Sequence, residues 1–348
     1  MPWRFSVAPM MDRTDRHFRA MFRAISRHAL LYTPMISAQS IVDGMASGPL
    51  GFDAVETPLA IQLGGSDAAV LAAAARIAAG LGFCEVNLNC GCPSPAASRV
   101  QWGAALMDHP GRVADAVAAM VAASPVAVTV KHRIGIAGRD DLEHLVGFVD
   151  AVAAAGAARV IVHARAAVLG GLSPAANRRV PPLRPEIVAA LVRARPQLVV
   201  VDNGGIDDVA TAQARWQHVG VAGGVMVGRA AYDDPYRWIA IDRIAFRDPS
   251  EPKSRAEIAE SVFERAARHV AEGGRAHAVT RHALGLWHGV LGARRARAQV
   301  AELGRGATLA QARAAITVLR TPAVLPTPAV LRTPAVPRSV AAEHDAQA

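Results

Sequence analysis

Residues 84–95 read Cys-Glu-Val-Asn-Leu-Asn-Cys-Gly-Cys-Pro-Ser-Pro, and this stretch indicates both a fold and a site. Polar and apolar residues alternate from Glu85 to Asn89, as they do in a β-strand. A glycine and a proline on either side of Cys92 then break the strand. The thiol of Cys92 is therefore expected on the loop that leaves the carboxyl end of a strand.

Similar apolar runs, rich in β-branched residues, punctuate the first 232 residues; they are 5–9, 29–36, 59–63, 85–89, 126–131, 159–163, 198–202 and 224–227. Ala-rich stretches with helical periodicity lie between most of them, at 67–81, 109–122, 140–155, 185–194 and 207–218. Strand-then-helix units of this number and length predict an α/β fold, the (β/α)8 TIM barrel. A doubly wound open sheet is the competing interpretation.

The residues at the carboxyl ends of the runs favour the barrel. They are Met10, Met11, Gln62, Asn89 to Cys92, Lys131, His163, Asn203 to Gly205, Gly228 and Arg229. In a barrel these ends meet on one face, where active sites are built. The glycine loops after the last two runs occupy the usual phosphate site of this fold. No G-x-G-x-x-G follows a strand and opens a helix, which favours a phosphorylated mononucleotide over a dinucleotide in a Rossmann site.

Composition narrows the protein class. Three cysteines in 348 residues argue against a disulfide framework, and their spacing lacks the paired Cys-x2-Cys pattern of zinc sites, so we expect no metal. No early run has the anatomy of a signal peptide. No run approaches the roughly 20 apolar residues of a membrane span. We expect a soluble protein of the reducing cytoplasm.

The positive charge is concentrated in one region. The formal net charge is +9, and the segment from Lys253 to Arg313 holds eleven Lys or Arg against five Glu. Nucleic acid is the natural partner of such a patch, although a solvated basic helix face has the same sequence pattern. Residues 251–315 read as helices without strands, broken at 273–274 and 304–306.

We therefore divide the chain into three parts: a catalytic barrel at 1–245, a basic helical domain at 246–318, and a tail at 319–348. In the tail a six-residue unit, Thr-Pro-Ala-Val-x-x, recurs from Thr321. Proline at this density prevents helix and sheet alike, so the tail is expected to be extended or disordered.

With these features the chain resembles the tRNA-dihydrouridine synthase family, most of all its DusA subfamily. The similarity extends over about residues 5–300. The matching segments recur in order at 8–12, 14–17, 62–65, 87–94, 130–135, 163–165, 171–174, 177–178, 181–183, 202–206 and 226–232. The set includes Asn-Leu-Asn-Cys-Gly-Cys-Pro-Ser at 87–94 and Asp-Asn-Gly-Gly-Ile at 202–206.

The resemblance implies a flavin enzyme that reduces uridines U20 and U20a in the tRNA D loop, with NADPH as the reductant of the flavin. It implies hydride transfer from reduced FMN to C6 of the uracil and protonation of C5 by Cys92. Thiols ordinarily titrate near pH 8.5 and so serve as general acids at neutral pH. The family pattern places FMN against Pro9, Met10, Met11, Gln62, Lys131, His163, Asn203, Gly204, Gly205, Gly228 and Arg229. It places tRNA against Asn89, Arg178, Arg294 and Arg297.

The chain departs from the family pattern at residues 95–98, Ala175, Ala296 and residues 166–168, and at Arg13, which replaces a tryptophan near the flavin; most of these positions are expected to face RNA. Two other functions therefore stay open. One is an FMN-dependent reductase of a small pyrimidine-like molecule, which the basic helical domain disfavours. The other is a catalytically impaired flavoprotein that binds tRNA.

Overall fold

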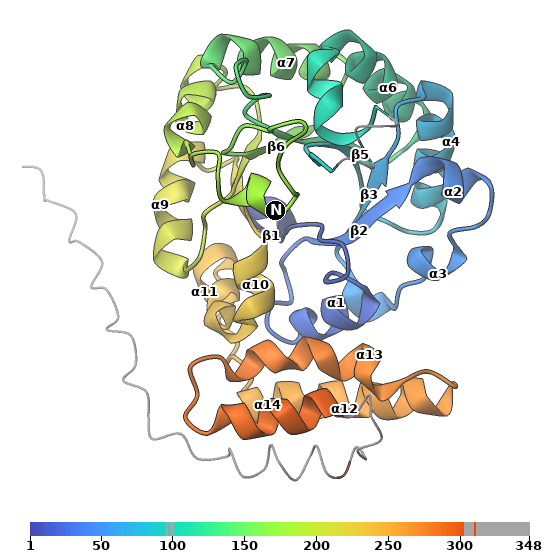
Figure 1. Cartoon of the computed structure of the whole chain (residues 1–348), viewed down its shortest axis with the longest axis vertical. Helices are drawn as coiled ribbons and strands as arrows, with labels where there is room; N and C mark the ends of the chain where they lie inside the picture. The colour runs from blue at the N-terminus through green and yellow to red at the C-terminus, as the bar shows by residue number, and fades with distance from the viewer. Residues whose placement is uncertain (95–96, 98–100, 303–309, 311–348) are drawn as a thin grey trace, which may run out of the picture.

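A computed structural model of the chain describes residues 1–94, 97, 101–302 and 310. Within these residues eight parallel strands form one sheet, in the order β1-β8-β7-β6-β5-β4-β3-β2. The strands are β1 (Phe5–Val7), β2 (Leu31–Ser37), β3 (Leu59–Gly64), β4 (Glu85–Cys90), β5 (Ala127–Arg133), β6 (Arg159–His163), β7 (Val200–Asn203) and β8 (Gly224–Val227). A parallel bridge between Ser6 of β1 and Leu30, the residue before β2, joins the two ends of this strand order. The sheet therefore closes into a barrel (Figure 1). The predicted (β/α)8 barrel is confirmed, and the open sheet is excluded.

Helices surround the barrel (Figure 1). Those that follow strands β3 to β7 are α4 (Ala68–Gly80), α6 (Pro110–Ala123), α7 (Leu142–Ala154), α8 (Pro185–Ala194) and α9 (Val209–Val219). The shorter ones are α1 (Arg16–Arg23), α2 (Ala38–Val42), α3 (Ser47–Leu50), α10 (Arg229–Asp233) and α11 (Ile241–Phe246). Short 3-10 helices also occur: η1 (Pro2–Arg4), η2 (Ala54–Glu56), η3 (Gly103–Asp108), η4 (Ala176–Arg178) and η5 (Pro235–Trp238).

Local sequence explains where several of these helices begin. Asp67, Asp141 and Asp208 each accept a hydrogen bond from the backbone N–H three residues on, at 2.7–2.9 Å, and so cap α4, α7 and α9. Helices α6 and α8 start with proline, whose fixed φ suits the first helical turn and whose missing N–H costs nothing there.

The apolar core of the barrel has an outer and an inner part. A large buried cluster lies between sheet and helices, and a smaller one contains Ala60, Ile161 and Val201. Each of these three lies two positions before Gln62, His163 or Asn203 on the same strand. Because alternate residues of a strand share a face, the smaller cluster fills the barrel interior directly beneath those polar residues.

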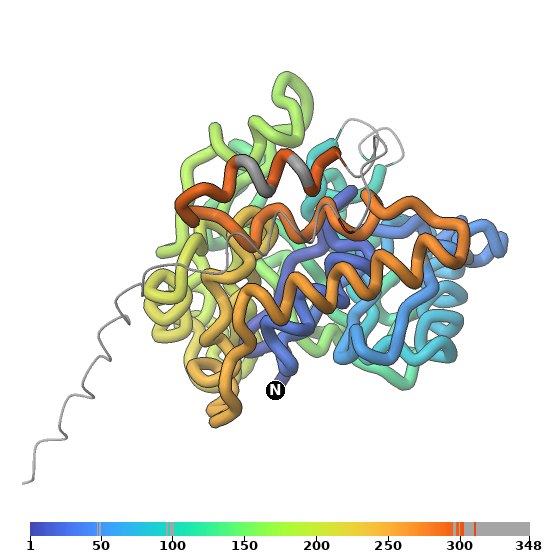
Figure 2. The backbone as a smooth tube through the Cα atoms, turned by 90° about the horizontal axis from the view of Figure 1, so that it is seen from below, coloured from blue at the N-terminus to red at the C-terminus, as the bar shows by residue number. Residues whose placement is uncertain are grey.

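The remaining helices pack together against one side of the barrel (Figures 1 and 2). They are α12 (Arg255–Ala271), α13 (Ala276–Thr280), η6 (Arg281–Trp287) and α14 (Ala293–Glu302), and they contact α1, α10 and η5. The predicted break at Gly273-Gly274 is confirmed, since α12 ends just before it. Phe263 and Leu286 belong to the same buried cluster as Phe18 of α1, so the apolar core is continuous across this contact.

The approach of η6 to the barrel is close. A Cβ added to Gly285 would lie 2.7 Å from Pro235 Cδ and 2.7 Å from the carbonyl oxygen of Tyr232. Any side chain at position 285 would therefore separate η6 from α10 and η5.

Part of the basic cluster is used at this contact. Arg281 donates to the Asp12 carbonyl at 2.9 Å and pairs with Asp15 at 2.6 Å. Arg265 pairs with Asp53, and Arg255 lies over the Tyr236 ring, 3.8 Å from its centroid. Fewer of the predicted positive charges are thus available to a partner than the sequence count indicates.

Three expectations cannot be compared with the structure. The tail at 319–348, the break at 304–306 and all of the loop at 95–98 except Ala97 lie outside the described residues. Among the residues that the structure does describe, no helix is long and apolar enough to cross a membrane.

Candidate active site

A cavity of about 620 Å³ opens at the carboxyl ends of the strands. It brings together side chains from segments that are far apart in the sequence. All predicted flavin positions line it, and so do Cys92, Asn89 and Arg178; the flavin positions are Pro9, Met10, Met11, Gln62, Lys131, His163, Asn203, Gly204, Gly205, Gly228 and Arg229. The prediction that the strand ends converge is therefore confirmed, although the roles of these residues stay predictions.

Part of the cavity lining is apolar. It includes Pro9, Met10 and Met11 of the loop after β1, together with Met35 and Met226. The hydroxyl of Thr14 braces this loop, since it accepts from the Met10 N–H at 3.0 Å and donates to the Met10 carbonyl at 3.1 Å. Polarisable thioethers beside a proline form a surface on which a planar ring can lie.

Other residues of the lining carry cationic and polar groups. The Lys131 ammonium donates to Asn203 Oδ1 at 3.0 Å, and Asn203 in turn donates to the Met226 carbonyl at 2.7 Å. Burial lowers the pKa of Lys131 to about 7, and the nearby charge of Arg133 adds to the effect. Burial likewise holds the pKa of His163 well below its usual value. His163 is thus a neutral imidazole at pH 7, with one nitrogen to donate and one to accept.

Glycine is required at the end of β7 for two reasons. Gly204 has φ +105°, a conformation that L side chains rarely adopt, and a Cβ there would lie 2.5 Å from His163 Cδ2. The backbone at Gly204 can therefore approach a ligand closely. Arg229 stands beside this loop at the start of α10, so a guanidinium and backbone N–H groups share one corner of the cavity.

The loop that carries Cys92 is held in place from both sides. Asn89 Oδ1 accepts from the backbone N–H groups of Gly91 and Cys92, both at 3.0 Å, and the Cys92 carbonyl accepts from the Ala104 N–H at 2.9 Å. The other two cysteines do not line the cavity. Burial raises the pKa of Cys84 to about 11 and that of Cys90 still further. Of the three cysteines, Cys92 alone lines this cavity.

Comparison with known proteins agrees with this geometry. Residues 6–320 match the family described as Dihydrouridine synthase (Dus). The chain belongs to the dihydrouridine synthase family. Enzymes of this family use a flavin to reduce uridine in tRNA, so the resemblance drawn from the motifs is confirmed.

Individual relatives are similar over most of their length. A Pseudomonas aeruginosa protein named tRNA-dihydrouridine(20/20a) synthase is 51% identical over 294 residues, which cover 84% of this chain and 88% of that protein. Proteins of the same name from Synechocystis and Xanthomonas campestris are each 48% identical, over 82% and 84% of this chain and 84% and 85% of their own lengths.

Sequence reasoning missed a residue of this candidate site, Arg133. Its guanidinium donates to the carbonyl oxygens of Gly91 at 3.0 Å, Ala166 at 2.9 Å and Asn177 at 3.1 Å. It thereby joins the Cys92 loop to the two segments after β6. The sequence does contain a signal that could have identified Arg133. It lies two residues after Lys131 on β5, so both side chains are on the same face of the strand.

The predicted tRNA contacts fall into two groups. Arg178 is exposed at the cavity and Asn89 lies in its wall, whereas Arg294 and Arg297 lie on α14, away from the cavity lining. Arg294 is exposed and Arg297 is half-buried. The cavity lining therefore includes two of the four residues, and a single partner that met all of them would extend from the cavity to α14.

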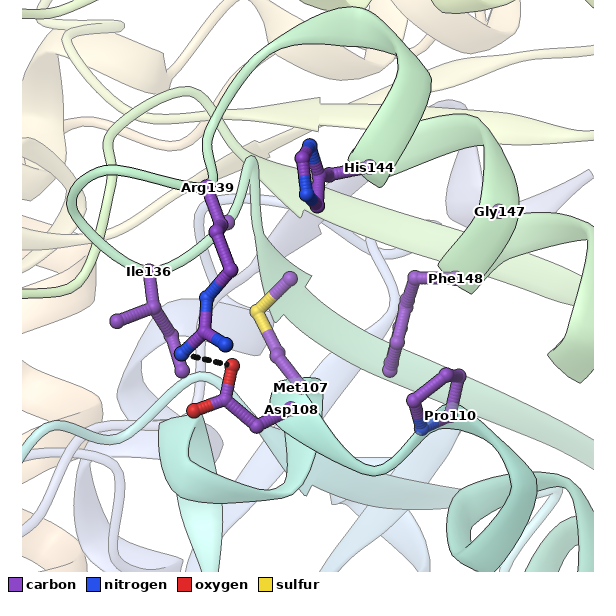
Figure 3. A pocket seen from close by; sticks show the side chains of 9 residues that line it. Met107, Asp108, Pro110, Ile136, Arg139, His144, Gly147 and Phe148 are labelled. Carbon is purple, nitrogen blue, oxygen red and sulfur yellow. Dashed lines mark ion pairs between the residues drawn. The ribbon is translucent and has the colours of Figure 1, made fainter.

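A second cavity, of about 370 Å³, lies beside α7 (Figure 3). Met107 and Phe148 line it, and an ion pair of 2.8 Å between Arg139 and Asp108 lies at one side. It shares no lining residue with the first cavity. We assign it no part in the dihydrouridine synthase reaction.

Proposed function

We propose that this chain reduces uridines 20 and 20a in the D loop of tRNA to dihydrouridine, with FMN as its flavin and NADPH as its reductant. The observation that carries the proposal is the single cavity shared by Cys92 and the eleven predicted flavin positions. The names of the relatives support the choice of uridines. A tRNA substrate places the proposed activity in the cytoplasm.

The residues present fit FMN. The cavity volume of about 620 Å³ lies within the range of roughly 300–1,000 Å³ for cofactor sites. An apolar wall beside Met10 and Met11 suits one face of the ring system. Gln62, Lys131 and His163 offer donors and acceptors for its polar edge. Gly204, with no Cβ, and the guanidinium of Arg229 suit the phosphate.

The proposed chemistry divides between cofactor and chain. When bound in its reduced form, the flavin supplies the hydride that C6 of the uracil accepts. Cys92 holds a proton at Sγ and donates it to C5. Asn89 and Arg133 keep the backbone of the Cys92 loop in place through the contacts described above. Protonated Lys131 stabilises negative charge that develops at the polar edge of the ring.

We assign flavin binding to residues 1–245 and tRNA binding to residues 246–318. The target base has to leave the RNA stack to reach the cavity, which costs a few kcal/mol. Arg178 at the cavity and exposed Arg294 on α14 can bind phosphates on either side of that base. Contacts of this kind supply the free energy that extrusion of the base requires.

The test uses the purified protein, with its flavin reduced by NADPH under anaerobic conditions. Unmodified tRNA should reoxidise the flavin of the wild-type protein, whereas free uridine should not. Cys92→Ala should keep NADPH-driven reduction but lose reoxidation by tRNA. Cys84→Ala, which removes a thiol outside the cavity, is the matched control and should behave like wild type.

Each contrary outcome contradicts a separate part of the proposal. Reoxidation by free uridine would indicate a reductase of small molecules. A flavin that stays reduced in the presence of bound tRNA would indicate a binding protein without turnover. Full activity of Cys92→Ala would refute the assigned proton donor.

A further inference from the structure

A continuous chain of hydrogen-bonded side chains runs through the barrel interior to the Cys92 loop. Thr129 Oγ1 and Glu85 Oε1 are 2.6 Å apart, and Asn87 Nδ2 donates to Thr129 Oγ1 at 2.8 Å. Gln62 Nε2 donates to Asn87 Oδ1 at 2.9 Å, and Asn89 Nδ2 donates to Gln62 Oε1 at 2.8 Å. We call Glu85, Thr129, Asn87, Gln62 and Asn89 the interior chain. Every member is at most 9% exposed.

The two ends of the interior chain give it one direction. At the upper end Asn89 Oδ1 faces the N–H groups of Gly91 and Cys92, which can only donate. At the lower end Glu85 pairs with the Arg159 guanidinium, and a carboxylate can only accept. The Tyr32 hydroxyl therefore donates to Glu85, at 2.5 Å, and so does that of Thr129. Each amide between the two ends has only one orientation that satisfies both neighbours.

Sequence and register together build this arrangement. Glu85, Asn87 and Asn89 alternate along β4, so all three point into the barrel. In the sheet register Asn87 is the direct partner of Gln62 on β3 and of Thr129 on β5. The three side chains thus lie in one layer across adjacent strands, and Glu85 and Asn89 lie below and above that layer.

Burial of so many polar groups needs a reason, because apolar residues fill the neighbouring interior. Ala60, Ile161 and Val201 occupy the same side of the sheet. A buried polar side chain contributes little net stability even when fully paired, and it is costly when a partner is lost. What the interior chain provides, and apolar residues could not, is a fixed orientation for the Gln62 and Asn89 amides at the cavity wall.

We propose that Glu85, Thr129 and Asn87 are positioning residues, which act through Gln62 and Asn89 to fix the Cys92 loop and the amide that Gln62 presents to the flavin. The inference rests on the proposed function for the identity of the ligand. The inference also states that the Thr129 hydroxyl controls the Cys92 loop through the side chains of Asn87, Gln62 and Asn89. This part concerns only residues that the structure describes.

The test compares substitutions that differ in one hydroxyl. Thr129→Val keeps the shape of the side chain but interrupts the interior chain, and Thr129→Ser keeps the hydroxyl. Ser6→Ala is the matched control, since Ser6 is also buried in the barrel and donates to the Val225 carbonyl at 3.2 Å, outside the interior chain. If Thr129→Val gives no folded protein, Thr129→Ala, which removes the same hydroxyl without adding a charge, replaces it.

Three readouts are taken on the flavin-loaded protein: the melting temperature, the flavin dissociation constant, and the rate at which iodoacetamide alkylates Cys92, resolved by peptide mass spectrometry. For Thr129→Val we expect flavin to bind about fivefold more weakly and Cys92 to be alkylated about fivefold faster. A factor of about five corresponds to the free energy of one typical hydrogen bond. Thr129→Ser should restore both values to within about twofold of wild type.

Ser6→Ala should lower the melting temperature without a change in either of the other readouts. The inference is overturned if Thr129→Val behaves like Ser6→Ala, with a lower melting temperature alone, or if Thr129→Ser fails to restore the wild-type values. Alkylation of Cys92 requires neither tRNA nor NADPH. Failure of the proposed reaction would therefore leave this measurement intact, and the two outcomes are distinguishable.

Discussion

A methyl group at position 204 should disturb the cavity in a way that the structure lets us calculate. In Gly204→Ala the new Cβ would lie 2.5 Å from His163 Cδ2, whereas an unstrained carbon contact needs about 3.5 Å. His163 therefore has to move by about 1 Å. Holding an alanine at φ +105° costs a further 1–2 kcal/mol, approximately, and forced repacking typically costs about 1–3 kcal/mol. We expect the free energy of unfolding to fall by about 2–5 kcal/mol.

The same displacement should weaken flavin binding, because His163 belongs to the proposed polar edge of the site. A lost or misplaced hydrogen bond of about 1 kcal/mol corresponds to a roughly fivefold higher dissociation constant, which is measured by fluorescence titration of flavin-free protein. Gly138→Ala is the matched control, since Gly138 has φ +89° but no atom within 4 Å of an added Cβ. Gly138→Ala should lose about 1–2 kcal/mol of stability and no flavin affinity. Equal flavin affinity of both variants and wild type would refute the reasoning.

Three other perturbations test separate groups. Because burial lowers the pKa of Lys131 to about 7, the cavity loses a positive charge as the pH rises through 7. The wild-type protein should bind FMN more tightly than Lys131→Met at pH 6, and in titrations across the range this difference in affinity should shrink by pH 8.5. Arg294→Ala should weaken tRNA binding and reduce its salt slope by about one phosphate contact, and unchanged binding would remove Arg294 from the interface. Burial alone would raise the pKa of Asp15, but His282 and Arg281 hold this pKa well below its usual value. The ionised Asp15 carboxylate therefore stabilises the folded state at neutral pH, and this stabilisation is lost as the pH falls below about 4. Asp15→Asn should therefore lower the melting temperature at pH 7, with a difference from wild type that shrinks below pH 4.

The barrel could be predicted because its strands are buried on both faces. Such strands appear as continuous apolar runs, and the helices between them have clear caps and periodicity. The convergence of Gln62, Lys131 and His163 followed from the same reasoning, because each lies within two residues of the carboxyl end of a strand. The predicted strand at 198–202 was displaced by one or two residues, since the structure places β7 at Val200–Asn203.

Contacts between distant segments could not be predicted in this way. The three carbonyls that Arg133 contacts come together only when loops after β4 and β6 fold against β5. The partners of Asn87 depend on register, which the hydrophobic pattern of fully buried strands leaves open. The charge count over residues 253–313 could not show that Arg265 and Arg281 pair with acidic residues of the barrel.

The close contact between η6 and the barrel limits how this enzyme can be engineered. Gly285 lies against Tyr232 of α10 and Pro235 of η5, and Arg281 binds the loop that begins with Pro9, so the helices that we propose to bind tRNA rest on a loop that lines the cavity. A chimera that took its helical part from another protein would need matching surfaces on α1, α10 and η5. The helical part is thus not freely exchangeable, and because we propose that it binds tRNA, altered tRNA preference is better sought through substitution of exposed Arg294 than through exchange of whole domains.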